Sequence, residues 1–460
     1  MKRRIAILGG GLAGMAAAIR VAEAGEVPVL VETRQRLGGR ATSFRDPRTG
    51  DILDNCQHVV MGCCTNLLEF YEATGVSELI EWHEATWWAD PPHDPVRMAP
   101  GLLPAPAHFL GSFARMRFLD RGVKREIRRA MLAMIRLGIG GRADWSDRTF
   151  GDFLRANGQS ETGIRLFWEV VVVSACNLRV DEVGADFALQ VFQEGFLGHR
   201  FASAMGLATV PLEQLYDPVV ARIREAGGEV RLGTSVLGIA YDGRRVGGLV
   251  TRDSMIDASA VIATVPFDRL SKLCSTPLKQ ADPRLRNLDE LEVSPILGVH
   301  LFFDVEVMAL PHMVLPGRST HWLFNKGVDD AGRQHLHAVI SGADDWMALD
   351  ETEVIERVLE DLHWAVPRSR GLAPIGHRAV KEKRATFRAV PGVDRLRPSV
   401  EPGIGVSNLF LAGDWCRSGW PATMEGAVRT GYAAAAAAVG GRGVMDDLPI
   451  ARGARLLGLR

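Results

Sequence analysis

Residues 5–14 read Ile5-Ala6-Ile7-Leu8-Gly9-Gly10-Gly11-Leu12-Ala13-Gly14. An apolar strand enters a glycine turn, and helix-forming residues follow over positions 15–23. A second strand, residues 28–31, ends at Glu32, eighteen residues after Gly14. This order predicts a dinucleotide-binding βαβ unit: the glycines allow close approach to a pyrophosphate, the helix N-terminus faces its charge, and Glu32 accepts hydrogen bonds from ribose hydroxyls.

The residues after Glu32 extend this prediction. Gly38, Gly39 and Arg40 suit a second loop that passes the pyrophosphate with a cation in reach. The predicted nucleotide contacts in the first forty residues are Gly9, Gly11, Leu12, Ala13, Gly14, Glu32, Gly38, Gly39 and Arg40. A strand-turn-helix without a nucleotide is the plain alternative, but it does not explain why all these elements occur together.

Composition excludes several classes of protein. The 460 residues include 54 Lys and Arg against 55 Asp and Glu, so no overall field attracts nucleic acid. The six cysteines show no CxxC pair, which predicts reduced thiols and no metal site. The basic start Lys2-Arg3-Arg4 before an apolar run imitates a signal peptide, but cleavage would discard the glycine turn. We therefore expect a cytoplasmic protein, peripheral at most to the inner face of a membrane.

The pattern along the chain predicts an α/β protein of the mixed α+β kind, in which insertions interrupt a Rossmann-type domain. We assign residues 1–85, 206–270 and 387–441 to the nucleotide-binding domain, 86–205 and 271–386 to a substrate domain, and 442–460 to a basic tail. Helix is expected over residues 66–88 and, buried, over 167–196, with a strand over 296–303.

A basic amphipathic helix or helix pair is predicted over residues 113–137. This segment contains eight Lys and Arg residues but only two acids, Asp120 and Glu126, and its apolar residues recur at helical spacing. The helix either packs on its own domain with a solvated charged face or docks on anionic lipid headgroups.

The C-terminal region supplies a second half of the site. Leu409-Phe410-Leu411-Ala412-Gly413-Asp414 reads as a buried strand that ends in a carboxylate, and a helix opens near Ala422, Thr423 and Met424. Asp414 could bind the ribityl hydroxyls of a flavin dinucleotide, while the helix N-terminus faces the pyrimidine edge of the ring. Together with Gly413 these residues predict bound FAD. Cys416 lies near in sequence, but we read it as a packing residue, with the FAD held non-covalently.

On these motifs the chain resembles the amine oxidase and phytoene desaturase superfamily of flavoproteins. The resemblance rests on the two glycine loops, Glu32, Val236 and Gly413-Asp414, and it implies that Val236 contacts the adenine through its backbone. A narrower resemblance, to the squalene-associated branch of hydroxysqualene dehydroxylases, covers nearly the whole chain. It is carried by Asp54-Asn55-Cys56-Gln57-His58, Phe167-Trp168, Asn177-Leu178, Ser294-Pro295-Ile296 and the run from Gly419 to Ala427. Cys56 departs from the pattern, since glycine is more usual there in this branch.

The narrower resemblance implies reductive removal of the hydroxyl of hydroxysqualene to give squalene, in bacterial hopanoid synthesis. An acid would protonate the allylic hydroxyl, water would leave, and hydride from reduced flavin would quench the cation in an apolar tunnel. Asp54, His58 and His300 are the candidate proton donors, although a structural role fits each of them too. The partners expected are an apolar isoprenoid substrate and an electron donor that the sequence does not identify, because no second complete glycine signature occurs.

Three other functions stay open. An amine oxidase of this family often carries a lysine on the strand that here spans residues 296–303, and this strand has none; Lys279 and Lys326 are the nearest. A carotenoid-type desaturase would use the same flavin and tunnel in the oxidative direction. A prenyl-binding escort protein without flavin is the non-enzymatic alternative, against which Glu32, Arg40 and Asp414 argue.

Overall fold

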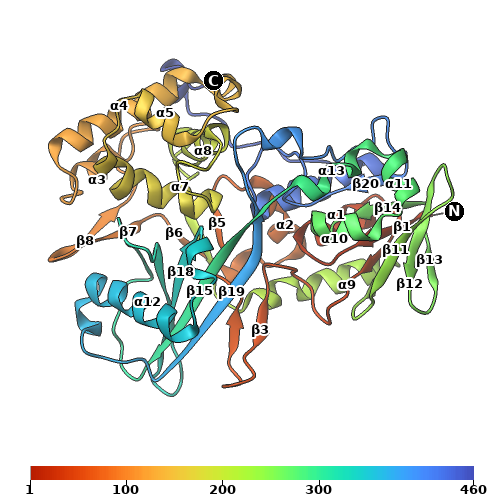
Figure 1. Ribbon diagram of the computed structural model, residues 1–460, viewed down its shortest axis with the longest axis horizontal. Coiled ribbons are helices and arrows are strands. Elements are labelled where there is room, and N and C mark those ends of the chain that lie inside the picture. Colours follow the sequence, from red (N-terminus) through yellow and green to blue (C-terminus); the bar gives the residue numbers. More distant parts are fainter. Residues whose placement is uncertain (1) are drawn as a thin grey trace.

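The nucleotide-binding lobe is built on a five-stranded parallel sheet. The computed structural model describes residues 2–460. Its sheet runs, in spatial order, β10 (Glu229–Arg231), β2 (Val27–Val31), β1 (Arg4–Leu8), β14 (Ala260–Ala263) and β20 (Leu409–Leu411). Strands from the beginning, middle and end of the sequence are thus hydrogen-bonded neighbours (Figure 1). The predicted Rossmann-type unit, interrupted by insertions, is confirmed.

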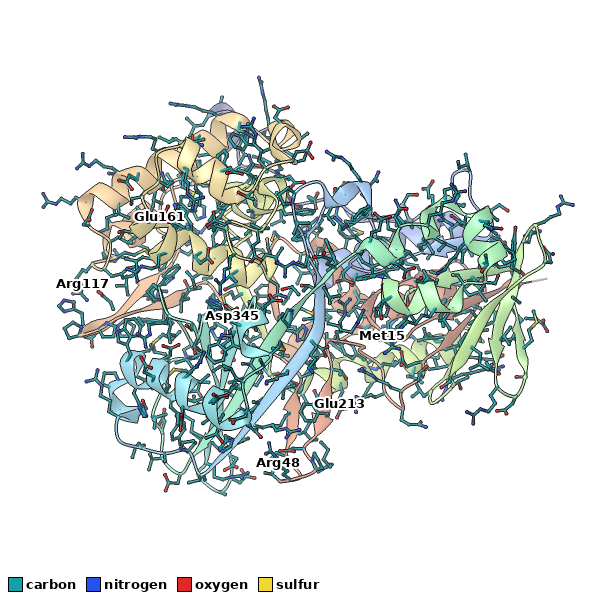
Figure 2. All side chains as sticks on the ribbon, viewed as in Figure 1. Met15, Arg48, Arg117, Glu161, Glu213 and Asp345 are labelled. Atoms are coloured by element: carbon teal, nitrogen blue, oxygen red, sulfur yellow. The ribbon has the colours of Figure 1, made fainter. Side chains whose placement is uncertain are left out.

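The glycine turn joins β1 to helix α1 (Leu12–Glu23) at very short range. A Cβ on Gly14 would lie 1.9 Å from the carbonyl oxygen of Gly9, so only glycine fits where the helix leaves the strand. Thr264, just after β14, donates its hydroxyl to the carbonyls of Leu8 and Gly9. Met15 of α1 is fully buried behind this turn (Figure 2).

A second, seven-stranded sheet forms the lower left part of Figure 1. Its order is β19 (Gly376–Phe387), β15 (Val293–Phe303), β18 (Gln334–Ser341), β17 (Trp322–Val328), β16 (His312–Val314), β7 (Thr86–Asp90) and β8 (His93–Met98). Alternate residues of β15, among them Leu297, Val299 and Leu301, pack with Val354 and Val358 of helix α12 (Glu351–Ala365) in one apolar core. The opposite face of β15 carries His300, which is buried against the end of β4 (Ile52–Asp54) and against His337 of β18.

Smaller sheets and further helices complete the molecule. The smaller sheets contain β11 (Val236–Tyr241), β12 (Val246–Thr251) and β13 (Met255–Asp257); β3 (Ser43–Arg45) and β4 (Ile52–Asp54); and β5 (Val59–Met61), β9 (Met205–Ala208) and β6 (Ile80–His83). The other helices are α2 (Thr65–Thr74), α3 (Leu110–Ala114), α4 (Arg121–Leu137), α5 (Phe150–Ala156), α6 (Glu161–Gly163), α7 (Glu169–Cys176), α8 (Ala185–Phe192), α9 (Asp217–Glu225), α10 (Phe267–Leu273), α11 (Thr276–Ala281), α13 (Met424–Val439) and α14 (Arg452–Leu456).

The expected helix over residues 66–88 is wrong beyond Thr74. Gly75 adopts a left-handed conformation, with φ at 80°, and ends α2. The residues that follow form β6 and β7, whose partners β9 and β16 lie far away in the sequence. The buried helices expected near residues 167–196 are confirmed as α7, α8 and adjoining π-helical turns. Within residues 2–460, no helix combines the length and the apolar character needed to span a bilayer.

Candidate cofactor and substrate site

The predicted nucleotide contacts gather at the carboxyl edge of the parallel sheet. Gly9 follows β1, Glu32 follows β2 and Asp414 follows β20, so all three lie where parallel strands end together. Glu32 accepts hydrogen bonds from the backbone N–H groups of Gly10 (2.7 Å) and Arg34 (2.8 Å), which fix its carboxylate beside the turn. This is the edge at which open α/β sheets bind their ligands.

The start of α1 suits a phosphate. Its N-cap residue is Gly11, and within residues 2–460 no side chain caps the helix and no acid lies in its first turn. The first backbone N–H groups, which include those of Leu12, Ala13 and Gly14, therefore keep their donors free at the positive end of the helix dipole. Gly38 donates its N–H to Gly10 at 2.9 Å, so the second glycine loop lies against the first.

Arg40 links the two halves of the site. Its guanidinium bonds to the Asp414 carboxylate and donates to the carbonyl of Ala385 at 2.7 Å. The carbonyl of Arg40 accepts a hydrogen bond from the side-chain amide of Asn55. Arg40 therefore connects the first strand-turn-helix, the strand end at Asp414 and the loop that follows β4.

Helix α13 packs directly on α1 and carries the last predicted contacts. Thr423 caps α13 by accepting from the N–H of Gly426 at 3.0 Å, which places Ala422, Thr423 and Met424 at the helix N-terminus. Thr430 exchanges hydrogen bonds with the backbone of Gly413 at 2.9 and 3.1 Å. This contact fixes the helix beside Gly413 and Asp414.

Glu425, which we did not place in the site, has a structural role. Its buried carboxylate accepts from the backbone N–H groups of Asn66 (3.2 Å) and Leu67 (2.8 Å), in the first turn of α2. Burial raises its pKa, while these hydrogen bonds and Arg429 act against that rise. Glu425 thus holds the N-termini of α2 and α13 together.

Val236 begins β11 close to Glu32. The N–H of Thr234 donates to the carbonyl of Glu32 at 2.9 Å, and Val236 follows two residues later. The position fits a contact with the adenine end of a dinucleotide whose ribose binds Glu32.

The three candidate proton donors lie together, but each already has a structural hydrogen bond. Asp54 accepts from the hydroxyl of Ser43 (2.7 Å) and from the N–H of Leu212 (3.1 Å). His300 Nε2 lies 3.0 Å from the carbonyl oxygen of Asp54, and His58 Nδ1 lies 3.0 Å from that of Cys56. Because a carbonyl only accepts, both ring nitrogens donate.

Two further histidines and Lys326 lie beside these three residues, although the sequence pattern did not place them in the site. His335 and His337 alternate along β18, so both face His300, whose ring stacks on that of His337 at 4.0 Å. His300 Nδ1 lies 2.9 Å from His335 Nε2, and both nitrogens of His337 are buried without a partner in the described chain. The alternation of His335 and His337 was the signal available in the sequence.

These histidines are neutral. Burial lowers the pKa of His300 to about 4 and lowers that of His58 and His337 as well. The charged pair beside them is Lys326 and Asp54, whose Nζ and Oδ2 atoms are 3.2 Å apart. Lys326 Nζ also donates to Gln57 Oε1 at 3.2 Å.

An apolar cluster adjoins this polar group on the same sheet face. Its members come from the loop after β4, from β5 and β9, and from three strands of the large sheet: Cys56, Val59, Met61, Met205, Leu207, Ile296, Trp322, Phe324 and Val339. Phe324 pairs with His337 in the β17–β18 register, so the apolar and the polar parts touch. The cluster offers hydrocarbon surroundings next to a few groups that bind an oxygen atom.

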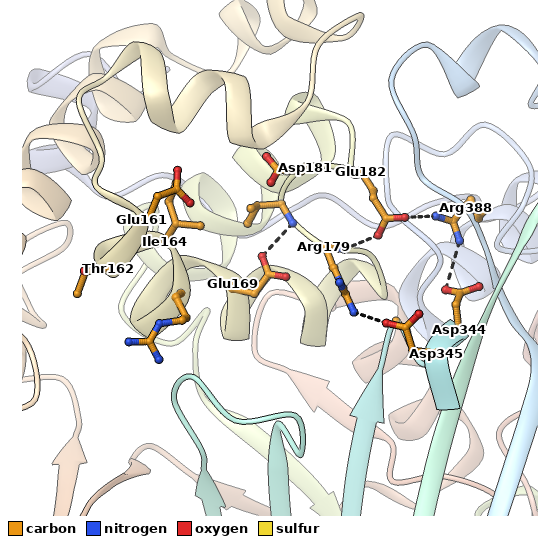
Figure 3. A pocket seen from close by; sticks show the side chains of 13 residues that line it. Glu161, Thr162, Ile164, Glu169, Arg179, Asp181, Glu182, Asp344, Asp345 and Arg388 are labelled. Atoms are coloured by element: carbon orange, nitrogen blue, oxygen red, sulfur yellow. Dashed lines mark hydrogen bonds and ion pairs between the residues drawn. The ribbon is translucent and has the colours of Figure 1, made fainter. Parts of the chain in front are cut away.

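Two cavities lie outside the apolar cluster, one away from the predicted nucleotide contacts and one at their edge. One of about 820 Å³ is lined by charged residues between α6, α7 and the large sheet, where Arg179 bonds Asp345 at 2.8 Å and Arg388 approaches Asp344 at 3.4 Å (Figure 3). It includes none of the predicted nucleotide contacts and does not suit an apolar substrate. The other, of about 140 Å³, touches Arg40 and Asp414.

Comparison with known proteins agrees with this geometry. The family described as flavin containing amine oxidoreductase matches residues 12–439. The chain is 27% identical over 453 residues to 15-cis-phytoene desaturase of Arabidopsis thaliana, covering 93% of this chain and 78% of that one. It is 28% identical over 454 residues to hydroxysqualene dehydroxylase of Sinorhizobium fredii, covering 95% and 98%. An oxidoreductase structure from Methanosarcina mazei superposes with a TM-score of 0.71 at 19% identity, covering 92% and 98%.

Proposed function

Because the chain belongs to the flavin-containing amine oxidoreductase family and is an FAD-dependent oxidoreductase, we propose that it removes the hydroxyl group of hydroxysqualene to give squalene. The observation that carries the proposal is the apolar cluster with one polar end on the face of the large sheet that holds His300. A long hydrocarbon would pack against the partly buried members of this cluster, and its single hydroxyl would lie at the polar end.

The chain's own residues fit FAD. The free N–H groups at the start of α1 and the Arg40 guanidinium would hold the pyrophosphate, Glu32 the adenosine ribose, and Asp414 the ribityl chain. The N-terminus of α13 would face the pyrimidine edge of the ring. Reduced FAD, when bound, supplies the hydride that replaces the hydroxyl.

The proton for this reaction comes from the polar residues beside the apolar cluster, which include Asp54, His337 and Lys326. The reaction consumes one proton and one hydride and releases water, so the leaving oxygen has to be protonated. We assign proton delivery to Lys326, whose Nζ donates to Asp54 and Gln57, because burial lowers the pKa of the neighbouring histidines. His337, whose nitrogens have no partner in the described chain, would bind the hydroxyl.

The apolar cluster protects the cation that forms when water leaves. Aliphatic and aromatic side chains exclude water that would restore the alcohol. The ring faces of Trp322 and Phe324, stacked at 5.6 Å, stabilise positive charge through their quadrupoles. Both effects favour transfer of hydride over addition of water.

A carotenoid-type desaturation is the second candidate, favoured by the likeness to phytoene desaturase over nearly the whole chain. The two reactions differ in the direction of electron transfer, since dehydroxylation oxidises the flavin and desaturation reduces it. Under anaerobic conditions we expect prereduced holoenzyme to convert hydroxysqualene to squalene, and oxidised holoenzyme with a quinone acceptor to leave phytoene unchanged. Desaturated phytoene without squalene would reverse the assignment.

Variants of two lysines test the proton-delivery step. We expect Lys326→Met to retain FAD but to lower the rate of squalene formation by about a hundredfold or more, the range typical of a lost general acid. Lys279→Met is the matched control, because Lys279 bonds Ser271 on α10, away from the sheet face. Equal rates for both variants would remove Lys326 from the mechanism.

A further inference from the structure

Several leucines stand out into solvent at one corner of the helical lobe. Leu102 is fully exposed and Leu456 is 88% exposed, while Leu103, Leu110 and Leu457 are about half exposed. Leucines that protrude this far contribute nothing to the core, and several together mark an interaction site.

Backbone contacts show that these leucines belong to one surface. The loop 99–109, which carries Leu102 and Leu103, touches the C-terminal helix α14, because Gly453 lies against the carbonyl of Ala105. The N–H of Ala451 donates to Gly198 at 2.8 Å, and Arg200 donates to the carbonyl of Gly101. The chain end is tied to α4 where Ile139 donates to Arg460 at 3.1 Å (Figure 1).

The loop that presents Leu102 and Leu103 is stiff. It reads Ala99-Pro100-Gly101-Leu102-Leu103-Pro104-Ala105-Pro106, and Gly101 donates its N–H to the carbonyl of His108. The prolines fix φ on both sides of the leucine pair. Little conformational entropy is therefore lost when these two side chains enter an apolar phase.

Positive charge is concentrated on α4 and on the chain end that carries Leu456 and Leu457, two segments joined by the bond between Ile139 and Arg460. Residues 110–137 contain eight Lys and Arg against Asp120 and Glu126, and residues 452–460 contain three Arg and no acid. Of the cations on α4, none forms an ion pair with any residue from 2 to 460. Arg125, Arg128 and Arg129 are exposed, although the whole chain has a net charge of only −1.

We propose that this corner inserts into the surface of an anionic lipid bilayer, with the leucines among the acyl chains and the arginines on the headgroups. Fully protruding side chains suit a fluid apolar phase better than a flat protein interface, and the surrounding charge complements lipid phosphates. The proposal refines the basic helix expected over residues 113–137, since it adds loop 99–109 and α14 to the contact surface.

The surface also leads toward the apolar cluster. Residues 198–200, which bond Gly101 and Ala451, lead into Phe201, whose ring centroid lies 5.0 Å from that of Trp82. The chain then enters β9, where Met205 and Leu207 belong to the apolar cluster. An isoprenoid dissolved in the bilayer would thus enter beside β9. This last step rests on the proposed function, whereas membrane binding itself does not.

Vesicle flotation of the holoenzyme tests the proposal. We expect binding to vesicles of phosphatidylcholine and phosphatidylglycerol in equal parts, and much weaker binding to phosphatidylcholine alone. The double variant L102S/L103S should bind about a hundredfold more weakly, at roughly tenfold for each leucine. R125E/R128E should lose the preference for the anionic lipid. Ile404→Ser and Arg244→Glu, exposed residues of the nucleotide-binding lobe, are the matched controls.

A second measurement distinguishes insertion from attraction to any polyanion. The six native cysteines are buried, so a cysteine at Leu102→Cys can be labelled alone with an environment-sensitive dye. We expect its emission to shift to the blue on anionic vesicles but not on heparin. The proposal would be overturned if the holoenzyme did not bind anionic vesicles, or if L102S/L103S left the binding unchanged. Dye emission that does not shift to the blue on anionic vesicles would also overturn it.

Discussion

Replacing Gly431 by alanine tests whether the two ends of the chain form one cofactor site. Gly431 lies in α13 where this helix crosses α1, and a Cβ there would come within 2.3 Å of the carbonyl oxygen of Ala13 and 3.1 Å of the Ala16 Cβ. Ordinary contact begins near 3.4 Å, so the helices would have to separate by about 1 Å. Overpacking of this kind costs about 1–3 kcal/mol, at the upper end where backbone is involved.

The expected effect on FAD follows from this separation. The higher helix propensity of alanine offsets about 1 kcal/mol, which leaves a net cost of roughly 1–2 kcal/mol. If FAD binds the packed arrangement of α1 and α13, its affinity falls by about 5- to 30-fold. Titration of apoprotein with FAD, followed by flavin fluorescence, measures this change.

Gly111→Ala is the matched control, because a Cβ on Gly111 of α3 meets no atom within 4 Å. We expect this variant to bind FAD like the unaltered protein. A Gly431→Ala protein with unchanged FAD affinity and unchanged thermal midpoint would show that α13 does not form the site with α1.

Three further predictions concern the cofactor and the buried titratable groups. Asp414→Asn should weaken FAD binding about tenfold or more, because the variant loses the charged partner of the Arg40 guanidinium; titration of the variant checks this. Burial lowers the pKa of His300, His312 and His321 to about 4, so the unfolded chain takes up protons first as pH falls from about 6.5. The free energy of unfolding should therefore be lower at about pH 5 than at about pH 7, by up to roughly 2 kcal/mol for each histidine, and an unchanged urea midpoint would contradict this. Burial raises the pKa of Cys416, so its thiol should resist alkylation in the native protein, and acid precipitation should release all FAD into solution.

The nucleotide-binding half was predictable because its signals are local. Gly9, Gly14 and Glu32 lie within one βαβ unit, whose spacing is set by the geometry of a turn and a helix. The strand at 409–411 and the helix opening near Thr423 were also readable, since an apolar run, a carboxylate and a capping residue follow in order. Each of these elements is confirmed.

The substrate half depends on pairings that no local pattern specifies. His300 meets His335 and His337 only because β15 and β18 pair antiparallel in one particular register. A register shifted by one residue would turn these side chains to opposite faces. The strands at 80–90, which we expected to be helical, show the same effect: β6 pairs with β9, more than a hundred residues later.

The basic helix pair shows how local signals locate a boundary. Residues 113–137 carry one amphipathic pattern, yet the chain divides into α3 and α4. Asp120 marks the break, since its carboxylate accepts from the N–H of Val123 at 2.8 Å and so caps α4.

Anaerobic single turnover measures whether hydride from reduced FAD replaces the hydroxyl of hydroxysqualene. Holoenzyme whose FAD has been reduced in advance is mixed with hydroxysqualene, and the return of the oxidised flavin absorbance is followed together with squalene by extraction. We expect both to appear at the same rate, with one squalene for each flavin oxidised. Flavin that stays reduced in the presence of hydroxysqualene, or squalene formed without flavin oxidation, would contradict this expectation.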